Sequence, residues 1–113
     1  MSKISFEDIG NVMATFYAQE GVQGGQVVKL TGNGTVGTCQ AGDAFCGVAG
    51  APRGGAVGVQ VSGFVKVAAT LPLSVGKNSL VADGKGGVKA GENGTEVLVV
   101  DVDTAENTAV ICL

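Results

Sequence analysis

The sequence predicts an all-β fold: a small single-domain barrel or sandwich of about eight short strands, with an N-terminal arm. Valine, which favours extended backbone, accounts for 19 of the 113 residues, and glycine, which favours turns, accounts for 20. From residue 24 onward, short apolar runs alternate with turn residues at the spacing typical of sandwiches and barrels. Any helix is expected to lie outside residues 25–70.

The apolar runs also place the individual strands. Along 56–68, valines alternate with small or polar residues until Gly63, where a bend in the strand is expected. The run "VLVVDV" (97–102) is apolar on both faces up to its last acids, so its strand should lie centrally in the sheet. We expect strands near 26–31, 35–39, 44–49, 56–68, 79–82, 86–90, 96–103 and 108–113.

The first residues differ from the rest of the chain. Residues 1–13 form the predicted arm and residues 14–113 the β domain, and the arm runs into a strand near 12–18. Buried on a partner, a large apolar side chain contributes about 1.5–3 kcal/mol before ordering costs. We therefore expect the arm to contact another chain through its five large apolar residues, Ile4, Phe6, Ile9, Val12 and Met13.

Two parts of the sequence echo each other. "GQVVKLTGNGTV" (25–36) resembles "GKNSLVADGKGGV" (76–88), and "AGDAFCGV" (41–48) resembles "NGTEVLVV" (93–100), 52 positions further on. Each pair combines a strand, a glycine-rich turn and further strands. The echo predicts two related units, each a hairpin plus a strand, folded around one core.

Residues 32–37 match the dinucleotide-binding pattern G-x-G-x-x-G letter for letter. That pattern requires a helix after its last glycine and an acidic residue about 20 positions further on. No helical period follows, Asp43 comes too early, and Asp83 comes too late. Asn33-Gly34 between apolar runs is a strong hairpin signal, so we predict a turn and no nucleotide site.

The other candidate sites also favour structural interpretations. Residues 101–107 place carboxylates at alternating positions, as a calcium loop does, but lack the glycine that such a loop requires. The chain has three cysteines and no histidine, which argues against a zinc site and against a thiol nucleophile with a histidine base. Cys39, Cys46 and Cys112 are expected to be reduced and structural. No catalytic residue, metal or cofactor is predicted, and no enzymatic activity.

Lys85 leaves one alternative open. It lies between glycines in "DGKGGV", at a predicted hairpin tip. Carrier domains that bear lipoyl or biotin present a lysine at such a tip, in a β fold made of two similar halves. The "DKA" or "MKM" residues usual around that lysine are absent here. A carrier or a small-ligand-binding β module is therefore the alternative from another functional class.

The charge and hydropathy of the sequence limit the classes of partner that the protein could bind. A net charge of −3 and seven scattered basic residues argue against nucleic-acid binding. No apolar run is long enough to span a membrane, and the start "MSKISFEDIG" lacks the apolar core of a signal peptide. Charged residues make up only 15% of the chain, against roughly 25% in typical soluble domains. A surface so poor in charge predicts assembly with other chains.

The order and spacing of "G.VV.L..NGTV", "GD.F.GV", "V.V.G.V.V", "G...L.ADG.GGV" and "LVV.VD" cover residues 14–113. This series resembles the small capsid decoration proteins of tailed bacteriophages and prophages. The resemblance implies a protein without catalysis, made in the bacterial cytoplasm, that binds the outer surface of the virion head and stabilises it.

The implied partners are further copies of the chain, as a homotrimer, and the major capsid protein. A tail or baseplate component is the alternative within the virion. Contacts with the capsid or a neighbouring subunit are expected at Ile4, Phe6, Ile9, Val12, Met13 and Arg53.

Overall fold

The computed structural model describes residues 10–113 and shows an all-β fold, with no helix in that range. This confirms the predicted fold class. The described residues also contain no helix that could span a membrane. The strands are β1 (Val12–Ala18), β2 (Val27–Gly32), β3 (Thr35–Thr38), β4 (Gly47–Ala49), β5 (Ala56–Ser62), β6 (Phe64–Ala68), β7 (Gly76–Ala82), β8 (Val88–Ala90), β9 (Thr95–Asp103) and β10 (Thr108–Cys112).

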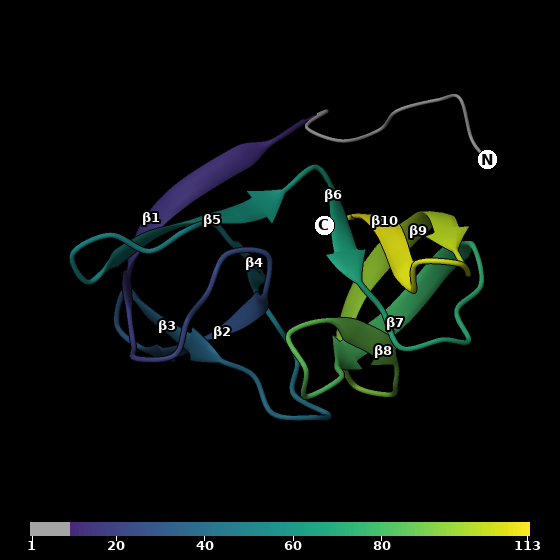
Figure 1. The fold of residues 1–113 in the computed structure, drawn as a ribbon, viewed down its shortest axis with the longest axis horizontal. Coiled ribbons are helices and arrows are strands. Elements are labelled where there is room, and N and C mark those ends of the chain that lie inside the picture. The colour runs from purple at the N-terminus through teal and green to yellow at the C-terminus, as the bar shows by residue number, and fades with distance from the viewer. Residues whose placement is uncertain (1–9) are drawn as a thin grey trace.

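The strands form two five-stranded units that lie side by side (Figure 1). The first unit, β1–β5, is a closed barrel with the strand order β1-β3-β2-β4-β5. The second unit, β6–β10, is a sheet with the order β6-β10-β9-β7-β8. In Figure 1 the first unit occupies the left half and the second unit the right half.

The two units repeat the same topology, which supports the echo in the sequence. In each unit the second and third strands form a hairpin, the fourth pairs with the second, and the fifth pairs with the first. The Gln19 N–H donates to the Val36 carbonyl at 2.9 Å, and the Thr70 N–H donates to the Val88 carbonyl at 2.8 Å. Val36 and Val88 are 52 positions apart, as the sequence echo requires.

One loop breaks this regular spacing. Gly47 pairs with Val28 in the first unit, and Thr95 pairs with Leu80 in the second. The fourth strands are therefore related by 48 positions, and the predicted spacing of 52 for 41–48 and 93–100 is wrong. The cause is the loop 39–46, which is longer than its counterpart 91–94.

The longer loop joins the two units. Its Gly42 N–H donates to the Ala82 carbonyl at 2.9 Å, and the Ala82 N–H donates to the Asp43 carbonyl at 2.8 Å. Phe45, only 4% exposed, packs into the core of the second unit. The Thr95 hydroxyl donates to the Phe45 carbonyl at 2.6 Å and fixes the loop there.

The buried side chains form two clusters, so the expectation of one core is wrong. The smaller cluster fills the barrel and contains Val28, Val36, Val57 and Val59. The larger one lies under the second sheet and includes Leu80, Val88, Val99 and Ile111. The first unit also contributes Val27, Phe45 and Val48 to the larger cluster.

The bend expected at Gly63 separates the units. Gly63 has a φ of +93°, which ends β5 and starts β6, so the predicted strand 56–68 is two strands. The Gln60 amide, almost fully buried, donates to the Ser62 and Phe64 carbonyls, both at 3.1 Å. These bonds hold the chain across the bend.

Four further predictions concern strand positions. The strand predicted at 12–18 is β1, and β9 lies between β10 and β7, as its doubly apolar pattern indicates. The predicted strand 44–49 is reduced to β4, because Phe45 leaves the barrel for the other core. The predicted strand 79–82 begins earlier, at Gly76, because pairing with Val99 of β9 extends it.

Candidate interaction surface

β1 presents exposed side chains along the outside of the barrel. Met13, Thr15 and Tyr17 are exposed, whereas Ala14, Phe16 and Ala18 between them are partly buried. This alternation follows from the two-residue period of a strand that has the barrel interior on one face. Met13 is 51% exposed and Tyr17 is 70% exposed, which is high for side chains of this size.

Three of the predicted contact residues lie in the described part of the chain. Val12 and Met13 are exposed at the start of β1. Arg53 is exposed at the other end of the strand, in a turn closed by hydrogen bonds between Arg53 and Ala56, which pairs with Tyr17. The structure thus brings Met13 and Arg53 to the two ends of β1. Ile4, Phe6 and Ile9 lie outside the described residues.

Two further exposed residues of the first unit were not predicted as contacts. Tyr17 pairs with Thr35, and Leu30, 57% exposed, pairs with Val36, so both lie beside β3 at the same end of the barrel. Alternation along β1 could have placed Tyr17 on the same face as Met13. The same alternation along β2 would have placed Leu30 on the buried face, because it shares that face with Val28, which is fully buried.

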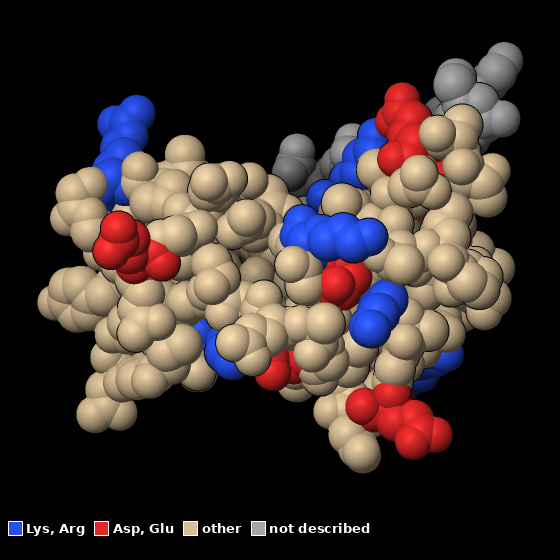
Figure 2. Space-filling model, turned by 60° about the horizontal axis from the view of Figure 1, so that its bottom comes forward, with Lys and Arg blue, Asp and Glu red and all other residues tan. Residues whose placement is uncertain are grey.

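Charge is scarce over the whole first unit. Residues 10–62 contain four charged side chains, Glu20, Lys29, Asp43 and Arg53, and residues 63–113 contain ten. In Figure 2 the charged side chains gather mainly on the right, over the second unit, while the left half is mostly uncharged. The low charge of the chain is therefore largely a property of the first unit, which also carries most of the exposed large apolar side chains: Val12, Met13, Tyr17 and Leu30, against Val75 and Leu98 in the second unit.

Two of the four charges in the first unit neutralise each other. Lys29 Nζ lies 2.6 Å from Asp43 Oδ2, and the Gln40 N–H donates to the same oxygen at 2.8 Å. Two hydrogen bonds hold the pKa of Asp43 below its ordinary value. The bond from Lys29 has the larger effect and the bond from Gln40 the smaller one. The same bond to Asp43 raises the pKa of Lys29. The pair anchors the loop 39–46 to β2.

The cysteines are free thiols, and all three are partly buried. Burial raises the pKa of Cys39 to about 11, and burial also raises the pKa of Cys46. Both thiols therefore stay protonated at neutral pH, which makes them weak nucleophiles. Cys39 directly follows β3, Cys46 directly precedes β4, and Cys112 is the last residue of β10.

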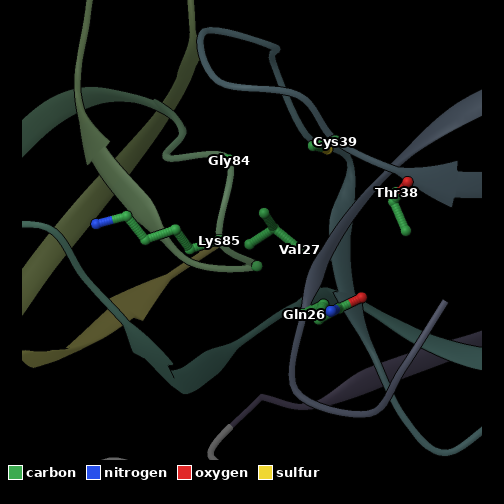
Figure 3. Close-up of a pocket in the computed structure, with 7 residues that line it drawn as sticks. Gln26, Val27, Thr38, Cys39, Gly84 and Lys85 are labelled. Atoms are coloured by element: carbon green, nitrogen blue, oxygen red, sulfur yellow. The ribbon is translucent and has the colours of Figure 1, made fainter. Parts of the chain in front are cut away.

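A pocket lies at the seam between the units (Figure 3). It has a volume of about 340 Å³ and is lined by Gln26, Val27, Thr38, Cys39, Gly84, Lys85 and Gly86. The Lys85 side chain points away from this pocket in Figure 3. Its backbone N–H donates to Asp83 Oδ1 at 2.7 Å, which fixes the hairpin tip between β7 and β8.

The acidic run at 101–107 is a hairpin end. Asp103 Oδ1 accepts the N–H groups of Ala105 and Glu106 at 2.9 and 3.1 Å and so closes the turn between β9 and β10. Among residues 10–113, no group of histidine, cysteine and acidic side chains is placed to hold a metal ion. The G-x-G-x-x-G stretch is the β2–β3 hairpin, with Asn33-Gly34 as its turn, as predicted.

Neither protein-family models nor curated proteins show a match to this chain. The surface of the first unit and the pattern of the sequence are the two features that bear on function.

Proposed function

We propose that the protein is a structural, non-enzymatic component of a bacteriophage or prophage virion that binds the outer surface of the capsid and stabilises the head as a homotrimer. The observation that carries this proposal is the charge-poor first unit with exposed Met13, Tyr17 and Leu30. Exposed apolar residues clustered on one part of a protein mark a contact surface for other chains.

The series of sequence motifs supports the choice of the capsid as the partner. It resembles head decoration proteins, whose function is to bind neighbouring capsid subunits from outside. Binding to the closed shell but not to separated subunits stabilises the shell by mass action. A contact surface on one unit leaves the more charged second unit to face solvent.

Binding to expanded heads tests this proposal. Heads assembled from the capsid protein of the same genome are mixed with the purified chain, pelleted and analysed for bound protein. We expect saturable binding with three copies at each three-fold position. We also expect the heads to be disrupted at a higher temperature when the protein is bound. No binding, or binding without added stability, contradicts the proposal.

The same particles distinguish the head from the tail. Electron microscopy of complete virions with labelled protein is expected to place the label on the head. Label confined to the tail or baseplate identifies a tail component and overturns the capsid assignment. Sedimentation equilibrium of the free protein measures whether the trimer already exists in solution.

A further inference from the structure

We infer that the open side of β1 receives an extended strand of the partner protein, which adds to the barrel wall at Met13–Phe16. This inference rests on the proposed function, because it names the kind of capsid segment that the first unit binds. It starts from the backbone hydrogen bonds of β1. The Tyr17 N–H donates to the Gly34 carbonyl beside β3, and the Ala18 N–H donates to the Gly55 carbonyl beside β5, both at 2.8 Å.

Along a strand, the backbone N–H and C=O groups of successive residues point alternately to the two sides, so the bonds of Tyr17 and Ala18 determine where the groups of residues 13–16 point. Ala14 and Phe16 direct their backbone groups toward Val59 and Val57 of β5. Met13 and Thr15 therefore direct theirs to the other side. β3 pairs only with Tyr17 and Ala18, so no strand of the described chain lies beside Met13 and Thr15. The barrel wall is open there.

The second unit provides an internal reference for this edge. The equivalent of β1 is β6, which pairs with β10 as β1 pairs with β5, and the equivalent of Thr15 is Lys66. The Lys66 ammonium group lies on the edge strand, 3.6 Å from Glu106. Charged side chains on edge strands, lysine above all, discourage pairing with other chains.

β1 has no such protection. Its sequence, "VMATFYA", contains no charged residue and no proline, and its residues favour strands. Of two edges built by one repeated topology, residues 10–113 protect one and leave the other without a neighbouring strand. An available edge with exposed backbone donors and acceptors is the template that β-strand addition requires.

The size of the edge favours a strand over a second copy of the chain. Four residues span about 13 Å at the rise of a β-strand. A β1–β1 contact of that length buries far less than the roughly 1,200 Å² of a stable dimer. Such a contact is also two-fold and cannot close a three-fold ring. The fitting occupant is an extended, uncharged capsid segment with apolar side chains toward Met13 and Tyr17.

The substitution Thr15→Lys copies the protected edge of the second unit and tests the inference. We expect the variant to fold with an unchanged far-UV circular dichroism spectrum and to lose about tenfold or more in affinity for expanded heads. Thr38→Lys is the matched control: it adds the same charge at an exposed position of β3, which lies between β1 and β2. This control should bind as the unmodified protein does.

Hydrogen exchange on the unmodified protein gives a second readout. The Met13 and Thr15 amides should exchange fast in the free protein and become protected on heads, whereas those of Ala14 and Phe16 are protected in both states. Binding to heads without new protection, or undiminished binding of folded Thr15→Lys, overturns strand addition and leaves the proposed function standing. Absence of any head binding by the unmodified protein overturns both.

Discussion

At the scale of single residues, two contacts control the junctions of this fold. Gly63 sits at the bend between the units with a φ of +93°, and a β-carbon built there lies 2.5 Å from the backbone of Gly10. Asp43 holds the inter-unit loop through Lys29 and Gln40. Both are consequences of local geometry, and each can be tested with one substitution.

Gly63→Ala is expected to destabilise the protein by more than the about 1–3 kcal/mol that left-handed backbone costs a non-glycine residue, because Gly10 must also move. The control is Gly25→Ala, where φ is +86° and nothing lies within 4 Å of the added carbon. Urea denaturation measures both. Equal losses in the two variants would show that the contact with Gly10 has no energetic weight.

Asp43→Asn is expected to reduce the dependence of stability on pH in acid. Because the pKa of Asp43 in the folded protein is below its ordinary value of 3.8, its stabilising effect is present above that value. The effect is lost as the pH falls through the lower, folded pKa. The difference in unfolding free energy between pH 7 and pH 3 should therefore be smaller in Asp43→Asn than in the unmodified protein. An unaltered difference in Asp43→Asn contradicts the role of the pair.

At the scale of elements, local signals predicted most strands and failed where packing between units decides the outcome. Asn33-Gly34 and the alternation along 56–62 are visible in the sequence, and both gave the correct structure. The destination of Phe45 is not visible, because only the folded second unit provides the space that it fills. The exposed residues differ in the same way. Met13 was predicted as a contact residue because it lies in an apolar segment of the sequence. The exposure of Leu30 depends on which end of the barrel stays open, and that is known only from the structure.

Phe45 is expected to couple the two units. Phe45→Ala should cost about 3–5 kcal/mol, the usual loss for a large aromatic side chain in a core, while Val75→Ala on the surface should change stability by about 0.5 kcal/mol or less. Calorimetry should show one unfolding transition for the unmodified protein, because the loop 39–46 places part of one unit in the core of the other. Two separate transitions would mean that the units unfold independently.

At the scale of the whole molecule, two units of the same topology have different surfaces. The topology is shared, but the first unit has few charges and an unprotected edge, whereas the second has most of the charges and a lysine on its edge. The difference in surface charge is not needed for folding, because the strands of both units contribute buried apolar residues to a core. Under the proposed function, a difference confined to the surface predicts that only the first unit contacts the capsid.

Adding carboxylates to the exposed apolar surface of each unit in turn tests that conclusion. Tyr17→Glu with Leu30→Glu places two carboxylates on the first unit, and Val75→Glu with Leu98→Glu places two on the second, all at exposed positions. Both double variants should keep the unfolding temperature, because neither removes a buried contact. The first should lose about tenfold or more in binding to expanded heads, since a carboxylate buried in an apolar contact is costly, whereas the second should bind nearly as the unmodified protein does. The reverse result would place the contact surface on the second unit and leave the low charge of the first without a role in binding.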